Sequence, residues 1–195
     1  MSVRELSLPG AVVFSTSKFV DARGSFAETF NAKVYEQAGI RENFVQDNYV
    51  VTEKAGTLRG LHFQRLPHAQ AKAVRVFRGR ILDVIVDVRV GSPTYGKWEG
   101  IELSAANAEQ LFVPVGFAHG YLTLEDNTEV FYKVSDFYAP QSEGGIVWND
   151  PDLAIDWPLD GRTPSLAERD EALPRLKDLQ QEFRYVEPKS AGNGA

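Results

Sequence analysis

Apolar and polar residues alternate with a period of two in several segments, and this pattern limits the fold more than any other feature. In segment 81–88 (ILDVIVDV), leucine and valine occupy every second position, and Asp83, Ile85 and Asp87 lie between them. Segments 72–77 and 128–134 alternate in the same way. Because successive side chains of a strand point to opposite faces, all three segments are predicted as strands.

Two of these strands carry a polar side chain on their apolar face. Lys72 shares its face with two valines of segment 72–77, and Tyr132 shares its face with two valines of segment 128–134. An inward tyrosine is more often simple core packing than a functional group. A lysine and a tyrosine that both point inward nevertheless need an explanation.

Turn signals separate the strand segments at short intervals, as in all-β sandwiches and barrels. Helix is scarce, and the best candidate lies late, where Ser165 and Glu168 have the spacing of a capping box. A rough apolar stripe follows it, interrupted by Pro174, and consists of Leu173, Leu176, Leu179 and Phe183. We predict a mainly β, antiparallel domain over residues 1–185 with a few short, chiefly C-terminal helices that cover it, and a frayed tail over 186–195.

Composition excludes several classes of function. The chain has 195 residues, which suits one domain, and it has no apolar run long enough to cross a bilayer. Its net charge of -6, with scattered lysines and arginines, opposes nucleic-acid binding. The absence of cysteine excludes thiolate nucleophiles and Cys-based zinc sites. The start of the chain does not resemble a signal peptide, so we expect a cytoplasmic protein with no membrane contact.

The chain has only three histidines, and each lies in a different sequence context. His68 follows Pro67 and is expected in a surface loop. His62 lies three residues after Arg59, although a histidine in such a strand is by itself more often a satisfied core residue. His119 completes the spacing Pro-x-Gly-x-x-His over residues 114–119, which resembles the second half of the cupin signature. This resemblance implies a cupin-like, jelly-roll β-barrel or sandwich.

The cupin resemblance raises the question of a metal. Metal-binding cupins place His-x-His on an upstream strand, whereas this chain reads His62-Phe63-Gln64. One imidazole and one amide make a poor site for a transition metal. We therefore predict that the protein uses no metal.

Several further motifs occur in order between about Asp21 and Asp170. They read DARGSFAE (21–28), VQDN (45–48), LRGLH (58–62), GSPT (91–94), PVGFAHG (114–120), YK (132–133) and GIVWNDP (145–151). Together they resemble the thymidine-diphosphate (dTDP)-4-dehydrorhamnose 3,5-epimerase family. The chain departs from the family before Asp170, where it reads Leu-Ala-Glu-Arg instead of Leu-Ser-x-Lys.

The resemblance implies an isomerase that needs no cofactor. The C4 ketone of the substrate, dTDP-4-dehydro-6-deoxy-D-glucose, acidifies the hydrogens at C3 and C5. By resemblance, His62 is the base, Asp170 orients its imidazole, and Tyr132 donates a proton from the opposite face. Lys72 and His119 would lie near the C4 oxygen and stabilise the enolate.

The resemblance also implies a set of contacts to the nucleotide sugar. Arg23 and Arg59 would bind the diphosphate through their forked guanidinium groups. Phe26 and Tyr138 would contact the base. The remaining predicted contacts are Glu28, Gln46, Asp47, Asn48, Glu143 and Arg169.

Two other functions remain open from the sequence. A relative could invert only C3 or only C5, and a non-catalytic cupin could simply bind a sugar. Inversion at both carbons would supply an L-rhamnose donor for surface polysaccharide. By resemblance we also expect a homodimer.

Overall fold

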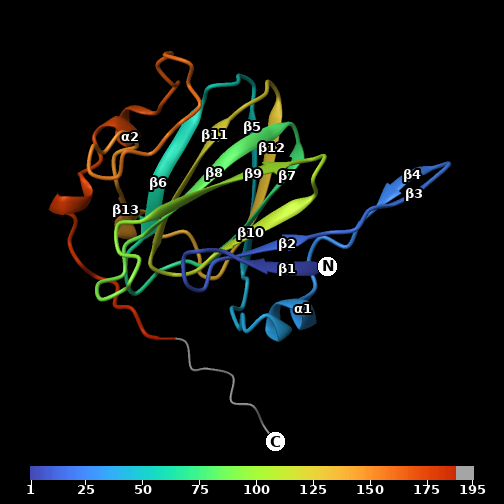
Figure 1. Cartoon of the computed structure of the whole chain (residues 1–195), viewed down its shortest axis with the longest axis horizontal. Coiled ribbons are helices and arrows are strands. Elements are labelled where there is room, and N and C mark those ends of the chain that lie inside the picture. The colour runs from blue at the N-terminus through green and yellow to red at the C-terminus, as the bar shows by residue number, and fades with distance from the viewer. Residues whose placement is uncertain (188–195) are drawn as a thin grey trace, which may run out of the picture.

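The computed structural model describes residues 1–187, and two antiparallel β-sheets packed face to face form its body (Figure 1). The six-stranded sheet has the order β1 (Ser2–Glu5), β2 (Val12–Ser15), β10 (Glu109–Val113), β7 (Lys72–Arg78), β12 (Thr128–Val134) and β5 (Gln46–Thr52). The five-stranded sheet has the order β13 (Glu143–Gly145), β6 (Leu58–Gln64), β11 (Phe117–Thr123), β8 (Arg80–Asp87) and β9 (Trp98–Ser104). This architecture confirms the predicted mainly β, antiparallel, cupin-like fold.

The main core lies between the two sheets. It includes Val74 and Val130 from the six-stranded sheet and Ile85 and Phe117 from the five-stranded sheet, with Tyr132 packed against it. The inward orientation predicted for Tyr132 is therefore confirmed. Sheets packed in this way bury the alternate side chains of their inner faces.

A second core covers the outer face of the five-stranded sheet. Val84 and Val86 of β8 pack there against Trp157 and Phe183 from the C-terminal part of the chain. Both faces of β8 are consequently buried, and its opposite face turns Asp83, together with Asp87, toward the space between the sheets. The aspartates of the alternating segment 81–88 thus lie inside the protein.

The helices correct the sequence-based prediction. Residues 165–183 form only the four-residue α2 (Glu168–Glu171) and the 3-10 turn η2 (Leu176–Asp178). Ser165 does not cap α2, because its backbone pairs with Thr57 at the start of β6 and the N-cap is Ala167. The segment still covers the sheet, as expected, but mostly as an irregular chain.

A longer helix lies near the N-terminus and was not predicted. Helix α1 (Ala32–Gln37) begins at Asn31, whose side chain accepts a hydrogen bond from Lys33 N. It packs Tyr35 onto the outer face of the six-stranded sheet, where the ring stacks on Phe14 at 4.1 Å between centroids. Another 3-10 turn, η1 (Pro140–Ser142), precedes β13.

A two-stranded hairpin, β3 (Phe19–Asp21) and β4 (Gly24–Phe26), extends away from the body (Figure 1). We call residues 19–26 the arm. Its apolar side chains are exposed, with Phe19 at 68%, Val20 at 77% and Phe26 at 68%.

The chain end bears on the predicted domain boundary. Tyr185 N donates a hydrogen bond to the Val90 carbonyl, so residue 185 still contacts the body. Most of the predicted tail, residues 188–195, lies outside the described residues. None of the helices found in residues 1–187 is long and apolar enough to span a membrane.

Candidate active site

A pocket opens between the two sheets and has two connected halves, each of about 370 Å³. Both halves share His62, Lys72, Tyr132, Arg169 and Asp170. A volume of this size suits a small organic ligand. The catalytic residues predicted from the sequence therefore meet in one place, although they come from β6, β7, β12 and α2.

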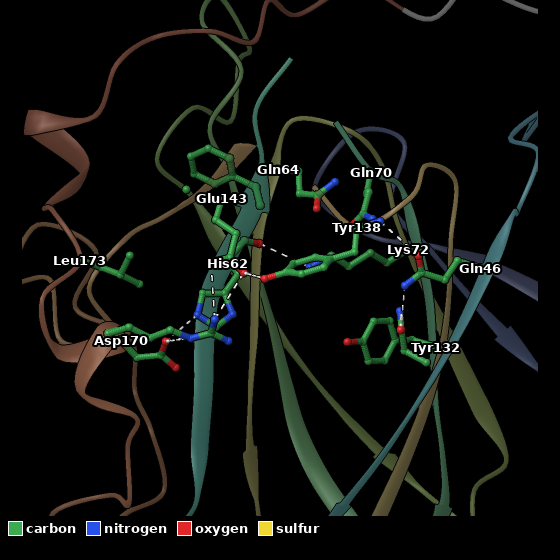
Figure 2. A pocket seen from close by; sticks show the side chains of 14 residues that line it. Gln46, His62, Gln64, Gln70, Lys72, Tyr132, Tyr138, Glu143, Asp170 and Leu173 are labelled. Carbon is green, nitrogen blue, oxygen red and sulfur yellow. Dashed lines mark hydrogen bonds and ion pairs between the residues drawn. The ribbon is translucent and has the colours of Figure 1, made fainter. Parts of the chain in front are cut away.

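Figure 2 shows His62 and Tyr132 on different walls of the pocket. His62 comes from β6 of the five-stranded sheet, and Tyr132 comes from β12 of the six-stranded sheet. Two proton-carrying groups on facing sheets can approach a bound molecule from different sides. This is the arrangement that inversion of a carbon centre requires.

Asp170 holds the His62 imidazole. Asp170 Oδ1 lies 2.8 Å from His62 Nε2, and Gly60 N donates to Asp170 Oδ2 at 3.3 Å. Burial acts to raise the pKa of Asp170, but the hydrogen bond and charge of His62, with smaller contributions from Gly60 and Arg169, bring the pKa below its usual value. An ionised carboxylate at Nε2 leaves Nδ1 as the ring nitrogen available to a ligand.

Glycines make the close approach of β6 and β11 possible. A Cβ atom at Gly120 would lie 2.7 Å from the Arg59 carbonyl oxygen, and Gly60 has a φ of +133°. The strand register shifts between His119 and Tyr121, next to this contact. The glycines of the two motifs thus bring His62 and His119 opposite each other in the sheet.

A second histidine–carboxylate pair lies deeper in the protein. His119 Nε2 lies 2.9 Å from Asp83 Oδ1, and Asp83 is fully buried. Burial lowers the pKa of His119, an effect that the Asp83 charge opposes. A neutral His119 whose Nε2–H donates a hydrogen bond to Asp83 presents its Nδ1 as an acceptor.

Lys72 completes this chain of polar contacts. Its Nζ lies 3.5 Å from His119 Nδ1 and 3.5 Å from the His62 carbonyl oxygen. Burial lowers the pKa of Lys72 to about 8, with Asp83 opposing the shift. Lys72 is therefore still mostly protonated at pH 7, so it places a positive charge inside the pocket.

Tyr132 is suited to donate a proton. Burial raises the pKa of its phenol, although the positive charges of Arg59 and Arg169 reduce the rise. The phenol consequently stays protonated at neutral pH. Tyr121, which also borders the pocket, has a pKa raised by burial as well.

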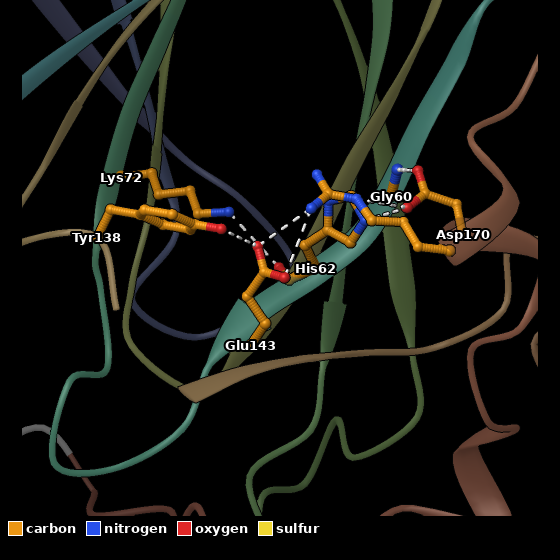
Figure 3. A network of polar contacts seen from close by, with 7 residues as sticks. Gly60, His62, Lys72, Tyr138, Glu143 and Asp170 are labelled. Carbon is orange, nitrogen blue, oxygen red and sulfur yellow. Dashed lines mark hydrogen bonds and ion pairs between the residues drawn. The ribbon is translucent and has the colours of Figure 1, made fainter. Parts of the chain in front are cut away.

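A polar network closes one side of the pocket (Figure 3). Tyr138 Oη donates to Glu143 Oε1 at 2.9 Å, and Arg169 Nη1 lies 3.4 Å from the same oxygen. Arg169 also lies 3.7 Å from Asp170 Oδ1, which links the network to the His62 pair. Three of the predicted ligand contacts are thus connected to the His62–Asp170 pair.

The structure brings most of the predicted ligand contacts to the pocket. Those that line it are Gln46, Asn48, Arg59, His119, Tyr138, Glu143 and Arg169. Asp47 does not, because β5 alternates and turns its side chain outward, where it forms an ion pair with Lys133 at 2.8 Å.

Arg23, Phe26 and Glu28 also lie outside this pocket. Arg23 and Phe26 are on the arm, where Arg23 forms an ion pair with Asp21. Glu28, just beyond the arm, accepts a hydrogen bond from Asn31 at 3.1 Å. A single chain therefore does not deliver these three residues to its own pocket.

Sequence reasoning missed three polar residues of the site. Gln64 and Gln70 line the pocket, and Asp83 supports His119 from below. The alternation in segment 81–88 contained the signal for Asp83, because it places a carboxylate between buried positions. His68, expected in a surface loop, lies between β6 and β7 with its Nδ1 3.4 Å from Asp136.

Among residues 1–187, no group of three or more His, Asp or Glu side chains is arranged to hold a metal ion. The Nε2 atoms of His62 and His119 each face an aspartate, and the Gln64 amide is bonded to backbone groups. Metal-free chemistry stays a prediction.

Comparisons with known proteins agree on one family. The family described as dTDP-4-dehydrorhamnose 3,5-epimerase matches residues 5–178. A protein of that name from Shigella flexneri is 46% identical over 171 residues, which are 87% of this chain and 93% of its own. The Legionella pneumophila dTDP-6-deoxy-D-glucose-3,5-epimerase, solved with dTDP-4-keto-L-rhamnose, has a TM-score of 0.90 and 40% identity, covering 95% of this chain and 98% of that one. A 3'-monoepimerase from Streptomyces bikiniensis, solved with dTDP-quinovose, has a TM-score of 0.82 and 37% identity over 88% and 86% of the two chains.

Proposed function

The chain belongs to the dTDP-4-dehydrorhamnose 3,5-epimerase family, and we propose that it converts dTDP-4-dehydro-6-deoxy-D-glucose to dTDP-4-dehydro-L-rhamnose. One observation carries the proposal. The Asp170-bound imidazole of His62 and the protonated phenol of Tyr132 lie on different walls of a pocket that also holds a lysine ammonium.

In the first step, His62 removes the hydrogen next to the C4 ketone. The electrons of the broken C–H bond move into the carbonyl and form an enolate, and the imidazole takes the proton. The Asp170 carboxylate at Nε2 stabilises the resulting imidazolium. The enolate oxygen would lie near Lys72, whose positive charge offsets the developing negative charge.

In the second step, Tyr132 returns a proton to the carbon from the opposite face. The O–H bond of the phenol breaks, the new C–H bond forms with inverted configuration, and the ketone is restored. The phenolate and the imidazolium then exchange protons with solvent. Because C3 and C5 flank the same ketone, one set of residues can serve both carbons in turn.

The nucleotide would be held by side chains around the same pocket. Arg59 and Arg169 offer guanidinium groups for the diphosphate. Tyr138 offers an exposed aromatic face for the base, and Gln46 and Asn48 point inward from β5. Arg169 would exchange its present contact with Glu143 for the phosphate.

The arm supports a homodimer. It exposes Phe19, Val20 and Phe26, and it carries Arg23, which the sequence predicted as a ligand contact. We propose that the arm packs on a second copy of the chain and completes that copy's pocket. The predicted cytoplasmic location and the role in surface polysaccharide synthesis remain predictions.

Proton NMR of the reaction in deuterated water tests the function. Incubation with dTDP-4-dehydro-6-deoxy-D-glucose should place deuterium at both C3 and C5 and should invert both centres. Exchange at only one carbon would favour a single-site epimerase, which the likeness to a 3'-monoepimerase makes a real alternative. Binding without exchange would indicate a non-catalytic cupin. Chelator treatment should leave the exchange intact, and a loss restored by a divalent metal would overturn the metal-free mechanism.

A further inference from the structure

Tyr138 lies in a short connecting segment, residues 136–139, that is held mainly by side chains from other parts of the chain. It connects β12, which ends at Val134, to η1, which begins at Pro140, and it belongs to neither sheet. Tyr138 is 54% exposed, and the neighbouring Phe137 is 63% exposed. Such a segment has few buried contacts of its own, so its hydrogen bonds determine how firmly it is held.

Glutamine side chains make most of the hydrogen bonds to this backbone. Gln70 Nε2 donates to the Asp136 carbonyl at 2.7 Å. Tyr138 N donates to Gln46 Oε1 at 3.1 Å. The three glutamines, Gln46, Gln64 and Gln70, come from β5, β6 and the loop before β7.

Of the three glutamines, Gln64 makes the most hydrogen bonds to the backbone of this region. Its Oε1 accepts from Ala139 N at 2.8 Å, and its Nε2 donates to the Phe137 carbonyl at 3.1 Å. The same Nε2 donates to the His68 carbonyl at 2.6 Å, which ties in the neighbouring loop. Gln64 is only 5% exposed, so all of these hydrogen bonds are made away from bulk water.

Only an amide fits these partners. A carboxylate could accept from Ala139 N but would face two carbonyl oxygens without a proton to donate. An imidazole has a single donor or acceptor at each ring nitrogen, which does not match this geometry. Gln64 occupies the position at which a metal-binding cupin would carry a histidine, and here both ends of its amide are bonded to backbone.

We infer that Gln46, Gln64 and Gln70 form a clamp that fixes segment 136–139 and thereby positions Tyr138 against the base of the nucleotide. The part of this inference that concerns the nucleotide rests on the proposed function. The Tyr138 hydroxyl is held separately by Glu143, so the clamp and this contact fix the two ends of the residue. In this scheme Gln64 and Gln70 are positioning residues that act through Tyr138.

Amide hydrogen exchange tests the clamp without any ligand. In Gln64→Glu, the hydrogen bonds donated to the Phe137 and His68 carbonyls are lost, and both oxygens face a carboxylate. The segment should then be held less firmly, so the amides of Tyr138 and Ala139 should exchange about tenfold faster or more. Amides of the central strand β8 should keep their wild-type rates, which shows that the fold is intact. Gln70→Ala, at a half-buried position, should have the same local effect if Gln64→Glu does not fold. Unchanged exchange in both variants would overturn the clamp.

Binding of thymidine diphosphate tests the role of Tyr138. Gln64→Glu should raise the dissociation constant of thymidine diphosphate about tenfold. The double variant Gln64→Glu/Tyr138→Ala should bind no more weakly than Tyr138→Ala alone, since Gln64 acts through that ring. Gln141→Ala, an exposed glutamine in η1, is the matched control and should bind normally.

The outcomes separate the clamp from the proposed function. Additive losses in the double variant would show that Gln64 does not act through Tyr138, even if the wild type is an active epimerase. Failure of the wild type to bind thymidine diphosphate would overturn the part of the inference that concerns the nucleotide. The exchange rates would still decide whether the glutamines hold the segment.

Discussion

Asp83 Oδ1 lies 2.9 Å from His119 Nε2, and this contact connects a fully buried carboxylate to the lysine of the pocket. His119 in turn lies 3.5 Å from Lys72 Nζ through its other ring nitrogen. The negative charge of Asp83 compensates the positive charge of Lys72 across the imidazole. In the proposed mechanism, these three side chains act as one unit that holds a cation where the enolate oxygen would form.

Replacement of Asp83 by asparagine should reduce kcat about 10²-fold, the usual order for loss of one charge-stabilising group. The substitution keeps the shape of the side chain but removes the charge that supports His119 and Lys72. KM should change much less, because Asp83 is buried below the pocket rather than in it. Steady-state kinetics of the purified variant measure both constants.

Asp87→Asn provides the matched control. Asp87 is equally buried on the same face of β8, but it binds Arg89, Ser92 and Thr94, away from the pocket. Its replacement should lower the free energy of unfolding while the folded protein keeps its kcat. Equal kcat losses in both variants would mean that Asp83 matters only for folding.

The sequence predicted the strands well because alternation is a local property. Lys72 and Tyr132 were placed inward by their phase alone, and both line the pocket. The same phase placed Asp83 on the opposite face of β8 from its valines, but it could not show that both faces are buried. That fact depends on the C-terminal segment that covers the sheet.

The features that the sequence did not predict depend on contacts between residues that are far apart in the chain. The capping pattern of Ser165 and Glu168 is overridden because Ser165 pairs with Thr57, and Leu58 N donates to the Ser165 carbonyl at 2.9 Å. The motif that contains Arg23 resembled a binding motif, yet the sequence could not show that it would form an arm extending from the body. The glutamine contacts to segment 136–139 join residues far apart in the chain and leave no local signal.

The pKa of Lys72 predicts how stability depends on pH. In the folded state this pKa is lowered to about 8 by burial, whereas an unfolded lysine has a pKa near 10.5. Between pH 8 and 10.5 the unfolded state thus binds more protons, so the contribution of Lys72 to stability should rise with pH. The pocket admits water to the ammonium, so the total gain should be about 1 to 2 kcal/mol.

Lys72→Met isolates this contribution. Urea denaturation of wild type and variant at several pH values should show the wild type gaining stability relative to the variant as pH rises from 8 to 10. Lys177→Met, at an exposed position, controls for the loss of a lysine charge. A pH-independent difference between wild type and Lys72→Met would contradict the burial of this ammonium.

Mixed dimers test the position of the arm. Arg23→Glu should impair binding of the diphosphate, and His62→Asn should remove the base, so each variant alone should be nearly inactive. If the arm of one subunit completes the pocket of the other, refolding the two variants together should restore activity. With random pairing, about half of the dimers would contain one subunit of each variant, and each mixed dimer would have one intact site. About a quarter of the wild-type number of active sites would therefore be restored. No recovery would show that the arm serves its own pocket or none.

Loss of His62 and loss of Tyr132, the two proposed proton carriers, should affect the reaction differently. In His62→Asn no group can remove the hydrogen at C3 or C5, so deuterium exchange and inversion should be lost together. Asp170 would lose the partner that helps to keep it ionised, and its pKa should rise toward the ordinary value. NMR in deuterated water follows exchange and inversion in the same sample.

Tyr132→Phe keeps the ring packing and deletes only the phenolic proton. His62 can still form the enolate, so exchange of substrate hydrogen for deuterium should persist in part. Inversion should fall about 10²-fold or more, above all at C5, because no positioned acid remains on the opposite face. Equal loss of exchange and inversion would show that the phenol is needed before the enolate forms, for example to polarise the ketone, and the acid role would then pass to another group or to water.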